Sequence, residues 1–394
     1  MICVTGGLSV SSHQVPMFIN DLFGRVSGKR IRDVRACLRA YSLVLELFDK
    51  YVRIPSARNV HYQPNVVYTG LMQLSMTGGY AESTMTDLRL RYGMEAPCGG
   101  AFLYRLKMLE YDEWYSRLRS VNDALLSVAG RLDMLREPVI CAIDYTKIPY
   151  YGMFNRYVTR SKHQRGTNHF YEYATISIVQ DGLRLCVYSK PVTLLEMKGD
   201  VVRELIEEAG RRGVKIKLLL LDRAFYTVEC INLLLELRIQ FIMPCVCNER
   251  VQGAVDSFGK EGRLSFSIHD NSGNKAGFTM VVYWSKEKGK FIPFATNVEG
   301  SVRRLLEMIP KEYRRRWGVE TSFRKVKEVF PMTTSPSPAI RLAYYMTAMI
   351  IYNLWQLVNI MLTTKCERRR TERYQVTLPF MITVLCAHLN GRLR

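Results

Sequence analysis

The pair Asp181-Gly182 constrains the fold more than any other short stretch of this chain. It separates two runs of period-two alternation, at residues 173–180 and 183–189. Asp-Gly in this setting is a strong signal for a tight hairpin, because a type I′ turn needs a left-handed backbone at both central positions. The sequence therefore predicts two antiparallel strands that are joined at this point.

Further apolar runs extend the hairpin into an α/β unit. Residues 139–145, VICAIDY, and residues 215–221, KIKLLLL, are short runs of the kind that form buried strands. Between and after them, the pattern predicts helices over 197–212 and about 227–238, and a last strand over 239–244. The predicted order is three strands, a helix, a strand, a helix and a strand, which indicates a sheet flanked by helices.

Two of these strands carry an acid. Asp144 interrupts the first apolar run, and Asp222 directly follows the fourth strand. A carboxylate in such a place costs free energy unless it is paired or binds a metal ion. An alternative for Asp144 is an acid that emerges at the strand end and caps a turn. For the neighbouring Arg223, we consider a phosphate contact, a contact that holds Asp222, and a surface ion pair.

A third acid lies in residues 310–330, PKEYRRRWGVETSFRKVKEVF, which Pro310 opens and Pro331 closes. We interpret this stretch as one helix of roughly 30 Å. Four side chains then share about 60° of its circumference. They are Tyr313, Arg316, Glu320 and Lys327. A carboxylate flanked by cations suits a metal ion with a polyanion across it. The alternative is a solvated face on which Arg316 and Glu320 pair at i, i+4.

The spacing Tyr, two residues, Arg, three residues, Glu, six residues, Lys resembles the signature around the last acid of a large group of insertion-sequence transposases. The resemblance extends to YTKIPYYG after Asp144 and to DRAFYTVECINLL from Asp222 onward. It implies a DDE-type transposase with a ribonuclease-H-like mixed sheet flanked by helices. The acids of such a domain occur in this order, on the first strand, after the fourth strand and on a late helix.

The same resemblance implies site residues and cofactors. Asp144, Asp222 and Glu320 would be the catalytic residues and the ligands of two divalent cations. Hard oxygen ligands suit Mg²⁺, with Mn²⁺ as a substitute. Arg316 and Lys327 would bind phosphates near the scissile bond, and Tyr313 would pack against or hydrogen-bond the nearby DNA backbone. No protein nucleophile is required.

The resemblance also orders the chain into segments. Residues 1–135 are rich in helix signals and are predicted to form a helical, DNA-binding domain, either with a helix-turn-helix or as a plain bundle. Residues 136–247 and 298–394 are predicted to be the two parts of the catalytic domain. Residues 248–297 are predicted to be a β-rich insertion. Within it, Trp284 either stacks on an extruded base or fills the core.

The charge of the chain indicates its partner. With 56 Lys and Arg against 36 Asp and Glu, the formal net charge is +20, which favours nucleic acid over an anionic membrane. We expect double-stranded DNA as partner, both as terminal inverted repeats and as target. A homodimer is expected, because paired cleavage needs both ends held together. The basic run at residues 365–373, KCERRRTER, would be a linker or a phosphate contact.

Several other classes of function lack support in the sequence. No phosphate-binding Gly-Lys-Ser/Thr loop and no Gly-x-Gly-x-x-Gly stretch occurs, so no nucleotide cofactor is expected. Ten scattered cysteines without zinc-like spacing and an N-terminus without signal-peptide features favour a cytoplasmic, nucleoid-associated protein. A catalytically silent, transposase-derived DNA-binding protein is the main alternative.

One segment has the length and composition of a membrane span. Residues 342–362, LAYYMTAMIIYNLWQLVNIML, contain no charge. Their amides, however, fall at helical spacing on one side; these are Asn353, Gln356 and Asn359. We therefore predict a central core helix and no membrane contact, with a membrane-associated basic protein as the alternative.

Overall fold

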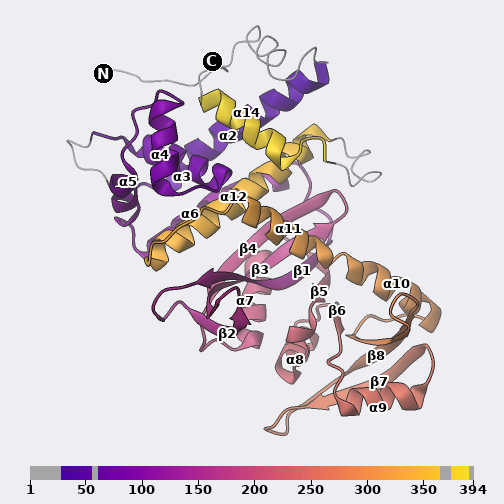
Figure 1. Cartoon of the computed structure of the whole chain (residues 1–394). Helices are drawn as coiled ribbons and strands as arrows, with labels where there is room; N and C mark the ends of the chain where they lie inside the picture. Colours follow the sequence, from indigo (N-terminus) through magenta and orange to yellow (C-terminus); the bar gives the residue numbers. More distant parts are fainter. Residues whose placement is uncertain (1–27, 56–60, 364–373, 390–394) are drawn as a thin grey trace. The chain divides into compact units, whose positions relative to one another are not determined.

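The computed structural model of the chain describes residues 28–55, 61–363 and 374–389 (Figure 1). Contacts divide the chain into two compact units, each described here by itself. One unit combines the described residues of Met1–Ala129 and Arg324–Arg394, and the other is Gly130–Phe323. The basic run at 365–373 and the N-terminal residues 1–27 lie outside the described residues.

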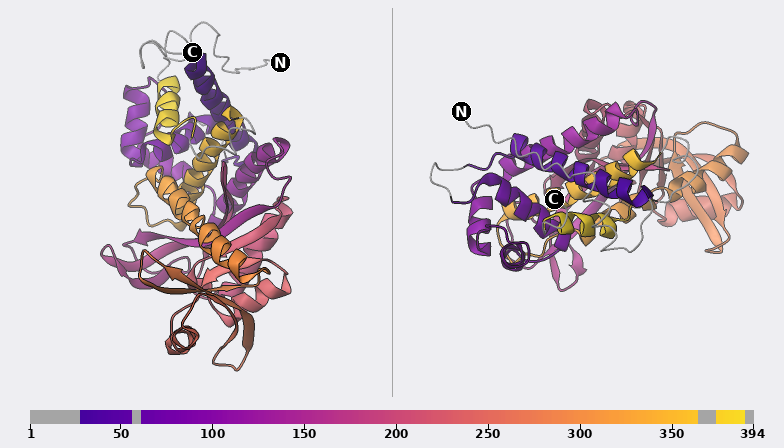
Figure 2. Two further views of the ribbon diagram at one scale, coloured as in Figure 1. Left: turned by 90° about the vertical axis from the view of Figure 1, so that its right-hand side faces the viewer. Right: turned by 90° about the horizontal axis from the view of Figure 1, so that it is seen from above.

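The first unit is helical, as the sequence predicts for the N-terminal region. Its helices are α2 Gly28–Tyr51, α3 Pro64–Thr77, α4 Ala81–Leu90, α5 Gly99–Leu106, α6 Tyr111–Arg131, α12 Pro338–Leu362 and α14 Leu378–Leu389. The late helices α12 and α14 lie among the N-terminal ones and contact α2 and α3 (Figures 1 and 2). The predicted catalytic segment 298–394 thus contributes its last part, from residue 324 onward, to this helical unit.

Helix α12 contains the apolar stretch that could pass for a membrane span. It is long and apolar enough to cross a bilayer, yet 94% of its most apolar window is buried in the structure. Its amide side chains form hydrogen bonds inside the helical unit. Asn353 donates to the Oδ1 of Asn122 at 2.6 Å, and Asn359 accepts from the backbone N–H of Val376 at 2.9 Å and donates to its carbonyl at 3.0 Å. These contacts agree with the predicted core helix.

The second unit is built on a nine-stranded mixed sheet. Its strands are β1 Val139–Tyr150, β2 Thr159–Gln164, β3 Thr167–Gln180, β4 Leu183–Val192, β5 Ile216–Leu221, β6 Phe241–Pro244, β7 Gly262–His269, β8 Lys275–Ser285 and β9 Lys290–Thr296. The strand order is β2-β3-β1-β5-β6-β9-β8-β7, and β4 pairs with β3. Strand β1 runs antiparallel to β3 and parallel to β5.

The predicted elements from 139 to 244 are confirmed. Gln180 pairs with Leu183 across the hairpin, and Gly182 has a positive φ of 70°. Asp181 has no positive φ, so the turn has one left-handed position and not the two of a type I′ turn. The helices that flank the sheet here are α7 Lys198–Arg211 and α8 Val228–Glu236. Strand β2 was not predicted, because its sequence TRSKHQ has neither apolar alternation nor a buried run.

The segment predicted as an insertion forms the strands expected of it but is not separate from the catalytic sheet. Strand β9 pairs with β6, so β7, β8 and β9 continue the same sheet. The segment also begins with an unpredicted helix, α9 Glu249–Phe258, which Asn248 caps by accepting from the N–H of Val251.

The single helix predicted over residues 310–330 is wrong. The structure has α10 Val302–Arg314 and α11 Trp317–Glu328, with a turn between them. Helix α10 begins at the cap Ser301, so Pro310 lies inside it rather than at its start. The turn carries Arg315 and Arg316, whose guanidinium groups pair with acids on the sheet. Those pairs, made with residues far away in the sequence, are not visible in helix periodicity.

Helices α10 and α11 pack on the sheet through an apolar core. Leu305 and Ile309 of α10 and Val319 and Phe323 of α11 join buried residues of β1, β5, β6, β8 and β9. On the opposite face of β8, Phe278 meets the ring of Tyr226, which precedes α8, at a centroid distance of 5.7 Å. The sheet is thus covered by helices on both faces, as the predicted fold class requires.

Candidate active site

Two of the predicted catalytic acids follow the last residue pair of the parallel strands β1 and β5, although β1 itself continues beyond Asp144. Ile143 of β1 is in register with Leu221 of β5, which places Asp144 and Asp222 at the same level. Carboxyl ends of neighbouring parallel strands are the usual place for polar ligands on an α/β sheet. Asp222 begins the short 3-10 helix Arg223–Phe225 and accepts from the N–H of Ala224 at 2.7 Å.

Arg316 brings the third acid to the first. Its Nη1 donates to the Oδ2 of Asp144 at 3.1 Å, and its Nη2 donates to the Oε1 of Glu320 at 2.6 Å. The guanidinium is buried, with 9% of the residue exposed. The pair at i, i+4 that the sequence offered as an alternative is therefore present, but the same guanidinium also joins α11 to β1.

Tyr313 completes this group from the end of α10. Its ring centroid lies 5.7 Å from the Cζ of Arg316, and its edge meets Phe294 at 5.1 Å between centroids. Burial raises the pKa of the Tyr313 phenol to about 12, while the Arg316 guanidinium acts in the opposite direction. The phenol therefore stays protonated at physiological pH and is available as a hydrogen-bond donor.

Burial raises the pKa of the Asp144 carboxyl from its ordinary value of 3.8 to about 6. The charge of Arg316 opposes this shift, and the charges of Asp222 and Glu320 add to it. Its Oδ1 accepts from the backbone N–H of Tyr145 at 2.8 Å. The charges of Asp222 and Glu320 therefore act on Asp144, and the charge of Arg316 compensates them only in part.

This shift predicts a gain in stability for Asp144→Asn in metal-free protein. The folded-state pKa lies above the unfolded one, so keeping Asp144 ionised opposes folding at every pH above about 6. We expect Asn to stabilise the protein by about 1–3 kcal/mol at pH 7.5, with the gain disappearing below about pH 4. Denaturant unfolding with a chelator at both pH values measures it.

Asp181→Asn is the matched control, because its carboxylate pairs with Arg315 at 2.7 Å on the surface of the same unit. It should leave stability unchanged or lower it slightly. Equal gains for both variants, or a gain for Asp144→Asn that persists at pH 4, would contradict the assigned cause.

The donor set fits a divalent cation by its chemistry. Asp144, Asp222 and Glu320 offer the hard carboxylate oxygens that Mg²⁺ prefers. As the side chains stand, no three His, Cys, Asp or Glu residues among those that the structure describes are close enough together to hold a metal ion. Arg316 instead supplies the positive charge between Asp144 and Glu320.

The other predicted DNA contacts are placed differently. Arg223 is exposed beside Asp222, and the described part of the chain gives it no salt bridge. Trp284 is 39% exposed near the end of β8 with its ring against Phe291, so the core role is wrong and the ring is accessible. Lys327 lies seven positions after Glu320 on α11, in the part of that helix that belongs to the helical unit.

Residues that the sequence interpretation missed hold the acids in place. The ring of Tyr145 stacks on Phe225 at 5.1 Å with an interplanar angle of 8°, which links the residue after Asp144 to the loop after Asp222. Lys198 donates to the carbonyl of Ala224 at 2.6 Å in the same loop. Aromatic residues beside both acids were the available signal, but the pairing arises only when β1 and β5 are neighbours.

Comparisons with known proteins agree with this fold. The family model described as a transposase DDE domain matches residues 136–354. A cryo-EM structure of the piggyBac transposase synaptic complex with hairpin DNA has a similar fold, with a TM-score of 0.55 and 12% sequence identity. That match covers 91% of this chain and 81% of the piggyBac chain. No curated protein matches the chain significantly. Because the family model covers more than half of the sequence, the chain belongs to the DDE transposase family.

Proposed function

We propose that this DNA transposase cleaves the ends of its own insertion sequence and joins them to target DNA, with Asp144, Asp222 and Glu320 as catalytic residues. The observation that carries the proposal is the pairing of Asp144 of β1 and Glu320 of α11 with one buried guanidinium, beside the register that sets Asp222 level with Asp144. Family membership supports the reaction class, and the arrangement of acids supports the assignment of residues.

Asp144, Asp222 and Glu320 would hold Mg²⁺, or Mn²⁺ in its place. The bound cations would supply activation of the attacking water or 3′-hydroxyl and stabilisation of the leaving oxygen. The protein's own part is to pair Asp144 and Glu320 with one guanidinium, to set Asp222 level with Asp144, and to keep Asp144 partly shielded from water. Its raised pKa means that the carboxylate is ionised, and able to act as a ligand, above about pH 6.

The DNA contacts follow from the surrounding cations and rings. Arg316, once displaced from the acids, would bind a phosphate near the scissile bond, and Tyr313 would donate to the adjacent backbone. Lys327 and Arg223 would bind further phosphates, and Trp284 would stack on an unpaired base. The substrates would be the terminal inverted repeats and target DNA, held by a homodimer on paired ends, in the cytoplasm at the nucleoid.

Metal-dependent excision tests this proposal. We expect a plasmid that carries the gene and its flanking DNA to yield the empty donor site when incubated with purified protein and Mg²⁺ or Mn²⁺. Chelation should lower the yield at least ~10³-fold, since the reaction then lacks its charge stabilisation. Amplification across the donor site measures the product.

The same assay separates the proposal from a silent DNA-binding protein. Protein that binds the end sequences but gives no empty site under any divalent-metal condition would refute the proposed cleavage. All three acids are present in the sequence, which favours the active enzyme.

A further inference from the structure

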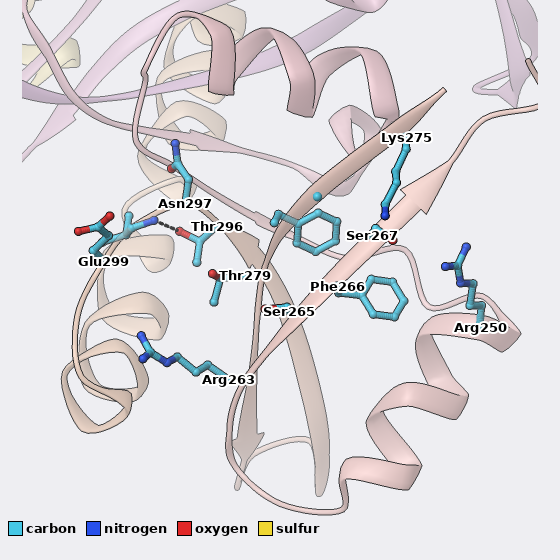
Figure 3. A pocket seen from close by; sticks show the side chains of 13 residues that line it. Arg250, Arg263, Ser265, Phe266, Ser267, Lys275, Thr279, Thr296, Asn297 and Glu299 are labelled. Atoms are coloured by element: carbon cyan, nitrogen blue, oxygen red, sulfur yellow. Dashed lines mark hydrogen bonds between the residues drawn. The ribbon is translucent and has the colours of Figure 1, made fainter. Parts of the chain in front are cut away.

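A hollow of about 750 Å³ lies on the sheet away from the three acids (Figure 3). It opens on the same face of β7 and β8 that packs against α10. The helix covers this face farther along β8, at Val281, which pairs with Phe294 of β9 in the buried core.

The part of the hollow's lining nearest to β5 is the end of β9, which β6 separates from β5. Thr296 pairs with Ile242, which pairs with Leu220, so residues 296–299 run toward the amino end of β5, away from Asp222 at its carboxyl end. The hollow is therefore distinct from the candidate active site.

The floor of the hollow is made of small side chains. Ser265 pairs with Thr279, and Ser267 pairs with Gly277, on the exposed face of the two strands. No hydrogen bond is formed by the hydroxyls of Ser265, Ser267 or Thr279 within the described part of the chain. A Cβ added to Gly277 would meet no atom within 4 Å. This floor lets a ligand approach the backbone closely and offers it hydroxyl donors.

Cationic side chains lie at both ends of the floor. Figure 3 shows Arg263 at one end, near Glu299, and Arg250 and Lys275 at the other. Arg263 is exposed and donates through one nitrogen to the carbonyl of Gly300 at 2.8 Å. The ammonium of Lys275 makes no hydrogen bond or ion pair among the residues that the structure describes. Three cations against one carboxylate favour an anionic ligand.

The spacing of these cations favours an extended ligand. Arg263 and the pair His269–Lys275 are six residues apart along β7, which is about 20 Å of strand. Along one DNA strand, phosphates follow each other at about 3.4 Å of helix axis, so this length matches about six base pairs. A small phosphorylated molecule would reach only one end.

We propose that this hollow is a second DNA-binding site, which holds the phosphodiester backbone of a duplex outside the catalytic centre. Arg263, Lys275 and Arg250 would contact phosphates, and the serine and threonine hydroxyls would donate to phosphate oxygens. The contacts are to the backbone only, so the site would be independent of sequence. This inference rests on the proposed function, because it takes DNA as the substrate of the protein.

Charge reversal at the hollow tests the inference by equilibrium binding. We expect Arg250→Glu with Lys275→Glu to weaken binding of a fluorescent 40-base-pair duplex about tenfold or more at 150 mM salt. The slope of log K against log salt should fall by about 2, one for each lost phosphate contact. Lys286→Glu with Lys288→Glu, in the turn between β8 and β9, is the matched control with the same change in charge. It should leave the slope nearly unchanged.

A second variant tests the floor without a change of charge. Gly277→Leu fills open space on the exposed face and should weaken duplex binding at least about threefold. Gly253→Leu, on α9 and equally open, should not. Circular dichroism and thermal melting establish that each variant is folded, and a Gly277→Ala variant, which adds only the Cβ, should bind nearly as wild type.

The DNA source is distinguished by two duplexes, one with the end sequences of the element and one unrelated. Equal losses on both duplexes are expected, because the proposed contacts are to the backbone, and a loss confined to the end duplex would contradict a site that is independent of sequence. The inference would be overturned if both charge-reversal pairs had the same slope of log K against log salt. It would also be overturned if charge reversal at the hollow weakened binding of a polyglutamate probe but not of DNA. Because binding is measured without cleavage, failed excision by wild-type protein would refute the proposed function and leave this result intact.

Discussion

Replacing Glu320 with Gln is expected to abolish excision, with empty-site product lowered at least ~10³-fold. This corresponds to about 4 kcal/mol of lost transition-state stabilisation, which is within the range that bound cations supply. The amide keeps the size of the side chain and can still accept from Arg316 but loses the negative charge. Asp222→Asn should have the same effect. Amplification across the donor site, with DNA binding measured in parallel, gives the result.

Glu307→Gln is the control for this prediction. Glu307 is a more exposed glutamate on α10 that pairs with Arg303, and its loss should leave excision within about twofold of wild type. Product from Glu320→Gln at the wild-type level would mean that Glu320 is not a catalytic acid. Loss of duplex binding in the same variant would mean that its defect lies in folding or in DNA contact.

Arg316→Ala is expected to destabilise the metal-free protein by about 3 kcal/mol, because it leaves a buried carboxylate without its partner. Millimolar Mg²⁺ should restore most of this loss, since the cation can then take over the charge between Asp144 and Glu320. Excision should still fall about 10²-fold, because the phosphate contact is gone. Arg316→Lys should be intermediate, since an ammonium cannot span both acids with a planar fork. Denaturant unfolding with and without Mg²⁺ measures the stability.

Arg315→Ala supplies the comparison from the neighbouring position. Its guanidinium pairs with Asp181 and Glu312, at 2.7 Å to each, away from the three acids. Its removal should lower stability by the same amount with and without Mg²⁺. A Mg²⁺-dependent recovery in Arg315→Ala, or none in Arg316→Ala, would contradict the role given to Arg316.

The strands around the acids were predictable because their signals are local. The runs before Asp144 and Asp222 are apolar enough to be buried, and Asp181-Gly182 specifies its own turn. Strand β2 has no such signal, since Thr159–Gln164 is polar and pairs only at an edge of the sheet. Local patterns therefore identify the buried centre of a sheet better than its margins.

The geometry of the site depended on contacts that local patterns do not contain. Arg316 meets Asp144 across 172 positions of sequence, and this pair accompanies the turn that divides the expected helix. By alternation, Trp284 belongs to the same face of β8 as the buried Phe278 and Met280. It lies near the end of the strand, however, and its ring is accessible there. The types and order of the three candidate acids can be read from the sequence, whereas the pairing of Asp144 and Glu320 with Arg316 cannot.

The two ends of the chain build one helical unit, and this has a consequence for biosynthesis. Helices α2 and α3 leave the ribosome early, but their packing partner α12 ends at Leu362. At about 5–20 residues per second, the apolar faces of α2 and α3 remain without α12 for roughly 15–60 seconds while the intervening unit is translated. That unit contains all of its own strands, so its sheet is fully translated before α12 is made. We therefore expect nascent or truncated chains that end before α12 to depend on chaperones, whereas full-length chains bury these faces only after synthesis is nearly complete.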